Sequence, residues 1–372
     1  PTAFCSYTSE ALDKKTPLLR SMSAVSQQSL RVLRSLGNKT VNKVTANIGA
    51  EQEYFLVDKR FFEKRLDLIV AGRTLFGAPA PKGQEMEDHY FGQIKDRVAD
   101  FMKDLDKELW KLGIAATTKH NEVAPSQFEM APIFTTANIA ADHNQLVMET
   151  LQKVAIRRGL VCLLHEKPYA RVNGSGKHTN WSLSTDEGAN LLEPGKTPHD
   201  NAQFLLFICA LISAVDRHAD IIRRSAANSG NDHRLGGHEA PPAIISIFMG
   251  EELTGILETI AKGQKAKSTA STTLKVGVDT LPALPKDNAD RNRTSPFAFT
   301  GNKFEFRMVP SSGSISRPCI VLNTVVSEAL DEMATRLEKA KNVHKETAAI
   351  IKDTMSEHGK IIFNGNNYAG DW

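Results

Sequence analysis

Cysteine is scarce in this chain of 372 residues, which holds only four: Cys5, Cys162, Cys209 and Cys319. They are far apart and include no Cys-x-x-Cys pair, which speaks against a zinc ribbon or a redox-active dithiol. Cys162 and Cys209 stand in apolar stretches that we interpret as helical, where a free thiol packs as a small hydrophobic group. Unpaired cysteines predict a reducing compartment, and we expect the cytoplasm or an organelle stroma.

The sequence also lacks an excess of one charge and a long apolar run. Its 46 Lys and Arg residues and 43 Asp and Glu residues leave a formal net charge of +3. This charge is too small to favour nucleic acid or an anionic membrane as a partner. The longest dense apolar stretch, residues 204–215, is too short to cross a bilayer and predicts a buried helix. We therefore expect neither kind of partner.

Hydrophobic periodicity predicts several helices and one long strand, residues 45–58. The predicted helices are residues 17–36, 94–112, 142–164, 204–224 and 318–342. The other candidate strands are short and bounded by turns, and they interleave with the helices, which indicates an α+β fold with an antiparallel sheet. Residues 226–242 predict a loop, and residues 262–290 predict a polar surface excursion. We divide the chain into a helical lead-in, residues 1–45, and a large domain, residues 46–372.

Two carboxylates, Glu51 and Glu53, lie two positions apart in the long predicted strand. Side chains alternate between the faces of a strand, so both point the same way and Gln52 points the other way. Neighbouring buried carboxylates repel each other. A divalent cation that prefers oxygen ligands, such as Mg²⁺ or Mn²⁺, would resolve the conflict. Taken alone, the triplet is more common on a solvated edge strand.

Further candidate metal ligands follow later in the chain. Glu122 and Glu129 flank Pro125, which breaks the run into two adjoining extended pieces that can converge. His178 follows a glycine turn, residues 173–176, whose glycines let the backbone approach a ligand closely. Taken singly, the two acids are also compatible with the surface, and the histidine with a hydrogen-bonded structural position.

Arginines and a lysine provide candidate contacts for anionic groups. The glycine-broken loop at residues 234–242 has the composition of a flap or of an ordinary connection. Arg291 and Arg293 offer rigid donor forks that suit phosphate and carboxylate. In residues 303–307, the charged side chains share one strand face opposite two phenylalanines, although an exposed row of ion pairs has the same pattern.

These motifs together supply five carboxylates, one histidine and several cations. No single motif establishes a site. The combination is that of a two-metal site for phosphoryl transfer from ATP, where metal ions and cations hold the phosphates and neutralise developing charge.

The same motifs resemble those of the glutamine synthetase family, and in particular its type III branch. The resembling blocks occur in the family's order and are residues 49–57, 121–125, 173–178, 239–242 and 291–297. The resemblance covers nearly the whole chain. It implies the catalytic-domain fold that glutamine synthetases share with guanidino kinases, a curved antiparallel sheet with flanking helices, over residues 46–372.

The resemblance also implies roles for individual residues. One metal ion would be held by Glu53, Glu122 and Glu129, and a second by Glu51, His178 and Glu305. The implied glutamate-binding residues are Asn173, Gly174, Arg234 and Arg307, and the implied nucleotide contacts are Asn180, Ser182 and Lys303. The implied catalytic residues are Glu239, a flap residue that helps to take a proton from ammonium, and Arg293, which stabilises the transferring phosphoryl group.

The implied reaction is the ATP-dependent ligation of ammonia to L-glutamate, which gives L-glutamine, ADP and phosphate through γ-glutamyl phosphate. The resemblance implies two or more Mg²⁺ or Mn²⁺ ions in each site. It also implies a homo-oligomer, for which we expect a dodecamer of two hexameric rings. Two alternatives stay open: ligation of the γ-glutamyl group to another amine, and a non-catalytic structural relative. The presence of all six candidate metal ligands argues against the structural relative.

The sequence departs from the family pattern at several places. Asn180 stands where bacterial type I enzymes carry a second histidine. Type I enzymes also have another arginine a few residues after the position of Arg293, and residues 297–299 of this chain supply none. Residues 262–290 contain no tyrosine, so we do not expect the adenylylation of type I enzymes. The family's small N-terminal β-grasp domain, which gives an aspartate to the ammonium site of a neighbouring subunit, is not recognisable. We therefore expect the chain to be part of a longer protein.

Overall fold

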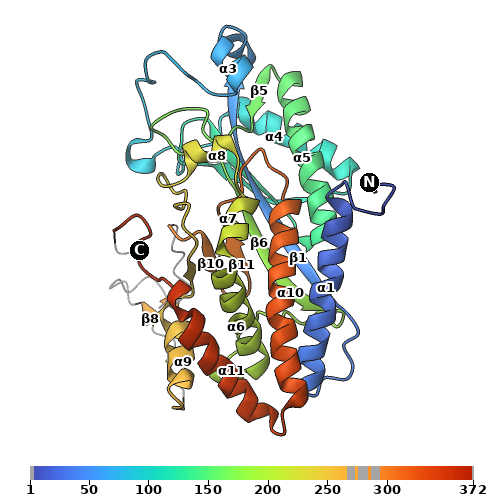
Figure 1. Ribbon diagram of the computed structural model, residues 1–372. Coiled ribbons are helices and arrows are strands. Elements are labelled where there is room, and N and C mark those ends of the chain that lie inside the picture. The colour runs from blue at the N-terminus through green and yellow to red at the C-terminus, as the bar shows by residue number, and fades with distance from the viewer. Residues whose placement is uncertain (1–3, 266–272, 275–283, 286–293, 371–372) are drawn as a thin grey trace.

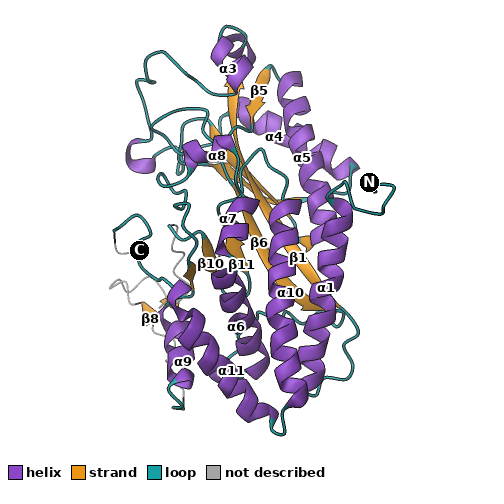
Figure 2. Ribbon diagram, viewed as in Figure 1, coloured by secondary structure: helices purple, strands orange, loops and turns teal. Residues whose placement is uncertain are grey.

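A computed structural model describes residues 4–265, 273–274, 284–285 and 294–370. The main strands are β1 (Val44–Asp58), β2 (Ala116–Asn121), β3 (Gln127–Pro132), β6 (Lys177–Thr185), β7 (Ile247–Phe248), β10 (Phe297–Phe299) and β11 (Phe304–Phe306). They form one sheet in the order β2-β3-β1-β6-β11-β10-β7, of which Figure 2 shows the neighbours β1, β6, β11 and β10. The neighbours along this order are antiparallel except for β10 and β7, which are parallel. The predicted α+β fold with a mostly antiparallel sheet is confirmed.

Strand β1 is the spine of this sheet. Its register with β6 sets Glu51 opposite His178, and its register with β3 sets Glu53 opposite Glu129. The short strands β4 (Thr135–Thr136) and β5 (Leu160–Leu163) also pair with β1. Because β1 has neighbours on both sides, the alternative of a solvated edge strand is wrong.

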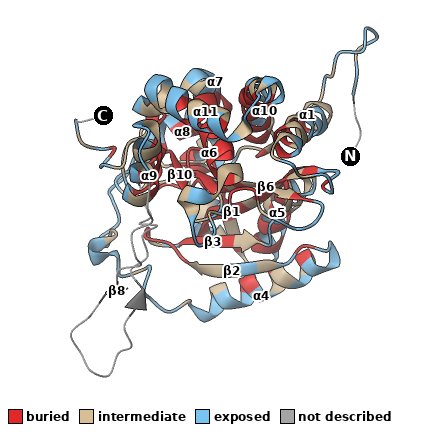
Figure 3. Cartoon of the chain, turned by 90° about the horizontal axis from the view of Figure 1, so that it is seen from below, coloured by how far each residue is buried: buried red, intermediate tan, exposed pale blue. Residues whose placement is uncertain are grey.

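Helices lie on both sides of the sheet. The helices of the larger layer are α1 (Lys15–Ser35), α6 (Ala202–Arg217), α7 (Ala219–Ser225), α10 (Ser316–Lys339) and α11 (Val343–His358). Figure 3 shows this layer on one side of the sheet and α4 (Asp96–Lys111) beyond β2 on the other. α1 and α10 run side by side (Figure 1), and α5 (Ala137–Arg157) packs against β1 and α4.

The helix pattern follows from two hydrophobic cores. Residues 204–215 of α6 are all buried, as expected for a helix that is apolar on every side. In α1, Leu18, Val25 and Val32 recur every seven residues and pack into this same first core. A second core joins α4 and α5 to β1, β2 and β3. The boundary predicted at residue 45 stays a prediction, although α1 shares the first core with α10.

Several predicted boundaries differ from the structure. The helix predicted to reach residue 164 ends at Arg157, because Gly159 has a left-handed φ of +67° and β5 begins at Leu160. The helix predicted over residues 204–224 is interrupted at His218, between α6 and α7. The predicted loop at residues 226–242 contains one short helix, α8 (Ser229–Arg234).

The remaining elements are short. They include α2 (Lys59–Phe62), α3 (Leu66–Ala71) and α9 (Glu251–Ala261), with β8 (Thr273–Leu274) and β9 (Leu284–Pro285) as a separate pair. Most of the excursion predicted at residues 262–290 lies outside the described residues. Within the described ranges, no helix has both the length and the apolar character needed to cross a membrane. Cys162, Cys209 and Cys319 are buried free thiols, and Cys162 lies in β5 rather than in the predicted helix.

Candidate active site

Strand β1 contributes the first two carboxylates of the site, because its side chains alternate between the two faces of the sheet. Glu51 and Glu53 line one cavity, as their spacing predicts. Gln52 points to the opposite face, where it is fully buried and donates to Ser311 Oγ at 3.0 Å. Gln52 Oε1 also accepts from Asn144 Nδ2 at 3.4 Å. One face of this strand therefore carries the carboxylates, and on the other face Gln52 is hydrogen-bonded to buried parts of the protein.

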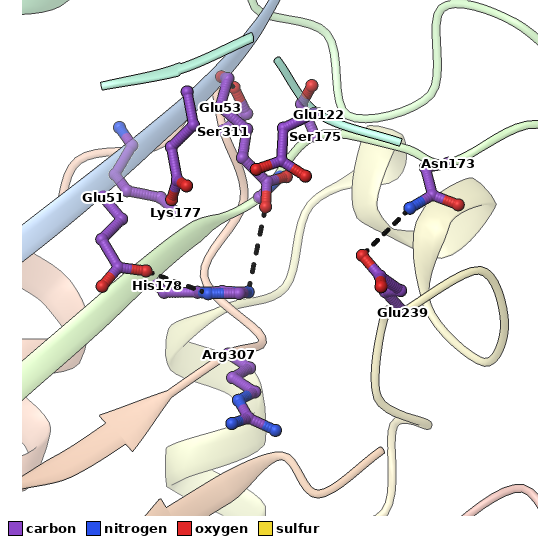
Figure 4. Close-up of polar contacts among 12 residues, drawn as sticks. Glu51, Glu53, Glu122, Asn173, Ser175, Lys177, His178, Glu239, Arg307 and Ser311 are labelled. Atoms are coloured by element: carbon purple, nitrogen blue, oxygen red, sulfur yellow. Dashed lines mark hydrogen bonds and ion pairs between the residues drawn. The ribbon is translucent and has the colours of Figure 1, made fainter. Parts of the chain in front are cut away.

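Strand β6 brings a histidine to the carboxylates of β1. His178 Nδ1 lies 3.1 Å from Glu51 Oε2, and His178 Nε2 lies 3.9 Å from Glu53 Oε1 (Figure 4). Two positions along the same face, Asn180 Nδ2 donates to Glu51 Oε1 at 2.9 Å. The glutamate at 51 is therefore held between two side chains of the neighbouring strand.

Strands β2 and β3 add two further carboxylates and a histidine that sequence reasoning missed. Glu129 lies in β3, and Glu122 follows the end of β2. His120 is opposite Glu129 in the β2–β3 register. Its Nε2 lies 2.9 Å from Glu129 Oε2, and its Nδ1 lies 3.5 Å from Glu122 Oε1. The available signal was the spacing of His120 and Glu122, two positions apart and close to Glu129.

Strand β11 completes the group from the other side. Glu305 Oε1 lies 3.2 Å from His178 Nδ1 and accepts from Arg307 Nε at 2.9 Å. Glu305 and Arg307 are buried, with 6% and 2% of their surface exposed, and Phe304 and Phe306 pack on the opposite face. The alternative of an exposed row of ion pairs is therefore wrong for Glu305 and Arg307.

These side chains converge on one cavity of about 260 Å³. Eight predicted residues line it: Glu51, Glu53, Glu122, Glu129, His178, Glu239, Glu305 and Arg307. Its other lining residues are Tyr90, Thr118, His120 and Ala131. A larger surface hollow of about 610 Å³ lies between α4 and α5 around Trp110, but it holds none of the predicted residues. We therefore take the smaller, acidic cavity as the candidate site.

Burial and repulsion by neighbouring carboxylates make two carboxylates of this cavity, Glu53 and Glu122, hard to ionise. Burial and the neighbouring carboxylates of Glu53 and Glu129 raise the pKa of Glu122 to about 10. Burial also raises the pKa of Glu53, against the opposing fields of His178 and Arg234. A cluster with these properties holds protons that a divalent cation can replace.

The site favours the charged form of its histidines, whereas it disfavours the charged form of Glu53 and Glu122. Burial lowers the pKa of His178, but the hydrogen bond to Glu51 and the charges of Glu305 and Glu53 outweigh it and raise the pKa to about 9. The hydrogen bond to Glu129 likewise raises the pKa of His120, although burial opposes it. Both rings therefore bind a proton more readily than a free imidazole does.

Two groups of side chains are close enough together to share an ion. Glu51, Glu129 and His178 form one group, and His120, Glu122 and Glu129 form the other, with ligand atoms in each group within 4.8 Å of one another. These groups differ from the predicted sets, which paired Glu129 with Glu53 and Glu122 and paired His178 with Glu51 and Glu305. All six predicted ligands nevertheless line the same cavity.

The glycine turn packs against protein rather than open space. A Cβ on Gly174 would lie 2.3 Å from the carbonyl oxygen of Glu166, and one on Gly176 would lie 2.0 Å from Arg234 Nη2. Arg234 is buried beneath the turn and donates from Nη2 to the carbonyl oxygen of Arg307 at 3.1 Å. The glycines therefore allow a buried guanidinium and a carbonyl to approach the backbone, a role that the sequence pattern alone did not reveal.

The loop after α8 carries Glu239 to the cavity. His238 and Glu239 both have left-handed φ values, +52° and +65°, which are unusual for residues other than glycine. Asn173 Nδ2 donates to Glu239 Oε2 at 3.2 Å (Figure 4). Glu239 is therefore held against the glycine turn, close to the carboxylate cluster.

The other predicted residues lie around the cavity or cannot be placed. Among the predicted residues that the structure describes, those outside the cavity lining are Asn173, Gly174, Asn180, Ser182, Arg234 and Lys303. Ser182 follows Asn180 on the same face of β6 and is opposite Asn47 in β1. Lys303 Nζ donates to the carbonyl oxygen of Thr300 at 3.4 Å. Arg291 and Arg293 lie outside the described residues.

Comparisons with known proteins show which family the chain is similar to. A family model described as the catalytic domain of glutamine synthetase matches residues 27–245. A Type-3 glutamine synthetase of Dictyostelium discoideum is 55% identical to the chain, over 100% of this chain and 51% of the relative. A glutamine synthetase of Butyrivibrio fibrisolvens is 53% identical, over 100% of this chain and 53% of the relative. The chain thus spans about half the length of the curated relatives it matches.

Solved structures are similar in fold at low sequence identity. The structure titled "Apo GmaS without ligand" has a TM-score of 0.54 and 14% identity, and the match covers 95% of this chain and 70% of that one. A cryo-EM structure of Plasmodium falciparum glutamine synthetase has a TM-score of 0.57 and 15% identity, and the match covers 89% of this chain and 58% of that one. These two likenesses bear on the fold alone.

Proposed function

This chain belongs to the glutamine synthetase family, and we propose that its whole protein joins ammonia to the side-chain carboxylate of L-glutamate with the use of ATP. The products are L-glutamine, ADP and phosphate, as in nitrogen assimilation. The observation that carries the proposal is the single cavity lined by six carboxylates, His178 and Arg307. The names of the relatives that match the whole of this chain support the same function.

The side chains of the cavity fit divalent cations. Buried carboxylates with raised pKa values are costly as anions unless a cation joins them, and carboxylate with one imidazole is a donor set that Mg²⁺ and Mn²⁺ accept. Bound ions of this kind supply positive charge that neutralises phosphate groups during phosphoryl transfer. We assign one ion to Glu53, Glu122 and Glu129, and a second to Glu51, His178 and Glu305.

The residues of the chain orient the two substrates for the first step. An oxygen of the glutamate γ-carboxylate attacks the γ-phosphorus of ATP, the bond from that phosphorus to the bridging oxygen breaks, and ADP leaves. Arg307 lines the cavity and is fixed by Glu305 at 2.9 Å, so it can hold a glutamate carboxylate without reorganising. We assign Asn173 and the backbone of Gly174 to the glutamate site as well, and Asn173 is hydrogen-bonded to the cavity residue Glu239. Arg234 lies beneath the glycine turn and would support this site through its hydrogen bond to the carbonyl oxygen of Arg307.

The flap residue Glu239 serves the second step. Ammonium loses a proton to its carboxylate, the ammonia nitrogen attacks the carbonyl carbon of γ-glutamyl phosphate, and the bond to the phosphate oxygen breaks. Water would react with the same carbonyl carbon, so the flap must also exclude solvent. The hydrogen bond from Asn173 to Glu239 at 3.2 Å supports a closed position of the flap over the cavity.

The nucleotide would extend from the carboxylate cluster along β6. Asn180 is hydrogen-bonded to Glu51, and Ser182 is two positions farther along the same face. Lys303 precedes β11, the strand paired with this part of β6. We propose that Arg293 stabilises the transferring phosphoryl group.

We further propose that the protein works as a homo-oligomer, a dodecamer of two hexameric rings, in the cytoplasm or an organelle stroma. The three buried free thiols are compatible with a reducing compartment. Several exposed apolar side chains, including Phe61, Val70 and Phe76, are compatible with burial between subunits. Native mass spectrometry of the whole protein tests the assembly, and twelve equal subunits is the expected result.

Product analysis tests the proposed reaction. The whole protein, supplied with ATP, Mg²⁺ or Mn²⁺, glutamate and ¹⁵N-ammonium, is expected to release ¹⁵N-glutamine, ADP and phosphate. Parallel reactions with methylamine, ethanolamine and putrescine separate this reaction from ligation of another amine. Product with one of these amines but none with ammonium would contradict the proposal. A Glu53→Ala variant with the same metal binding as the parent would point to a structural relative instead.

A further inference from the structure

The flap, the loop at residues 234–242, is strained at its tip. His238 and Glu239 adopt consecutive left-handed conformations that L-residues rarely take. Two backbone hydrogen bonds close the loop on itself, from Gly236 N to Pro241 O at 3.0 Å and from Ala240 N to Gly237 O at 3.1 Å. A loop with an unfavourable backbone needs contacts from the surrounding protein to keep one conformation.

Such a contact comes from a distant part of the chain. Tyr368 Oη donates to the carbonyl oxygen of Ala240 at 2.8 Å. Ala240 is the residue directly after Glu239, so this bond acts on the strained tip itself. Burial and the nearby charge of Glu239 raise the pKa of Tyr368 to about 12, so the hydroxyl keeps its proton and continues to donate.

The segment that carries Tyr368 is firmly attached to the body. We call residues 362–370 the clasp; it follows α11 along the edge near α9 (Figure 1). Asn367 is buried, and its Oδ1 accepts from Ser246 Oγ at 2.7 Å while its backbone N–H donates to Thr294 Oγ1 at 2.9 Å. Asn364 Oδ1 accepts from the backbone N–H of Met249 at 3.1 Å and of Gly250 at 3.0 Å. Tyr368 therefore acts on the flap from a fixed base.

We propose that Tyr368 is a positioning residue whose hydroxyl holds the flap in the conformation that keeps Glu239 over the cavity. Asn173 binds the side chain of Glu239 from the glycine turn, and Tyr368 binds the backbone next to it from the clasp. The flap tip is thus held at two points. The proposal rests on the proposed ligase function, because the flap protects the γ-glutamyl phosphate that this function forms.

Loss of this hydrogen bond has a specific chemical consequence. A more mobile flap admits water to γ-glutamyl phosphate, where a water oxygen attacks the carbonyl carbon and phosphate leaves. Glutamate is regenerated and ATP has been used without glutamine. The loosened flap also presents Glu239 less often to ammonium. Tyr368 is thus expected to govern the coupling of ATP use to glutamine formation, and the KM for ammonium more than the KM for ATP.

The test compares Tyr368→Phe with the parent protein, as whole assembled enzymes. Phenylalanine keeps the ring and removes the donor, so the fold is retained, and unfolding temperatures confirm it. The parent is expected to release equal amounts of ADP and glutamine. The variant is expected to raise both the ratio of ADP to glutamine and the KM for ammonium by about 2- to 10-fold, the range that corresponds to one hydrogen bond. Tyr7→Phe, at a fully exposed position, is the matched control.

Hydrogen exchange of the flap provides a second readout that does not depend on catalysis. Amides of residues 236–240 are expected to exchange faster in Tyr368→Phe than in the parent, while amides of α6 do not change. Unchanged exchange and an unchanged ratio of ADP to glutamine in the variant would overturn the proposal. If the parent itself makes no glutamine, the proposed function fails, and flap exchange alone decides the role of Tyr368.

Discussion

The backbone N–H of Gly176 donates a hydrogen bond to Glu53 Oε2 at 2.6 Å. This bond joins the glycine turn before β6 to a carboxylate of β1. On the other side of Gly176 lies the guanidinium of Arg234, which itself donates to the carbonyl oxygen of Arg307. One residue without a side chain thus sets the spacing between a candidate metal ligand and two arginines.

Gly176→Ala is expected to disrupt the site. The new Cβ would lie 2.0 Å from Arg234 Nη2 and 2.4 Å from its Cζ, so the buried guanidinium must move. Displacement of a positioned group by about 1 Å can cost about 100-fold in rate, and we expect a loss of that size in kcat/KM for glutamate. Gly255→Ala in α9, where a Cβ meets nothing within 4 Å, is the matched control. Parent-like kinetics of Gly176→Ala would refute this reading of the turn.

Glu122→Gln is expected to stabilise the protein when divalent cations have been removed. Burial and neighbouring carboxylates raise the pKa of Glu122 from its ordinary value of 4.5 to about 10. A raised folded-state pKa gives stability that is fully present below pH 4.5 and is lost as the pH rises through about 10. Glutamine cannot ionise, so the chelator-treated variant should unfold at a higher temperature at pH 8, by about 2–4 °C for each kcal/mol gained.

The same variant should respond less to added metal. Thermal unfolding with and without Mn²⁺ measures both effects, because an ion that binds only the folded state raises its stability. Glu187→Gln, at an exposed position, should unfold like the parent in every condition. A Glu122→Gln variant that is less stable than the parent without metal would mean that repulsion does not dominate at this carboxylate.

Lys177→Met is expected to destabilise the fold from the far face of the sheet. Lys177 is completely buried, and its Nζ donates to Asn144 Oδ1 at 2.9 Å and to the carbonyl oxygen of Gly313 at 2.5 Å. Burial lowers the pKa of this lysine to about 7, so part of the cost of a buried charge is already avoided. Two unsatisfied acceptors then dominate, and we expect a loss of about 1–3 kcal/mol.

Urea denaturation of Lys177→Met and of a surface variant measures this loss. Lys107→Met is the matched control, because Lys107 is exposed and its Nζ lies 3.8 Å from Asp104 Oδ1. Equal unfolding free energies for both variants would show that the buried lysine contributes nothing net to the fold.

Much of the site could be predicted because it depends on local rules. The two-residue period of a strand places Glu51 and Glu53 together, and the same rule places His178, Asn180 and Ser182 on one face of β6. The order of the blocks then carried the resemblance, which implied the roles of individual residues. Local rules do not give the pairing register between strands that are far apart in sequence, so the contact of Glu51 with His178 required the structure.

The features that sequence reasoning missed depend on packing between segments. His120 has its role because β2 pairs with β3, and glycine is needed at 174 and 176 because Glu166 and Arg234 approach the backbone there. The clasp has no periodic pattern, since its polar side chains act singly. The end of α5 was placed too late because the apolar run at residues 160–164 continues the helical pattern, and Gly159 was the overlooked signal.

The most direct test of the account is to locate bound metal ions in the assembled protein. Crystals soaked in Mn²⁺ and measured near the manganese absorption edge show each ion as an anomalous difference peak. We expect at least two peaks in the cavity, one against Glu53, Glu122 and Glu129 and one against Glu51, His178 and Glu305. An absence of peaks between these side chains at saturating Mn²⁺, or peaks only at the protein surface, would contradict the account.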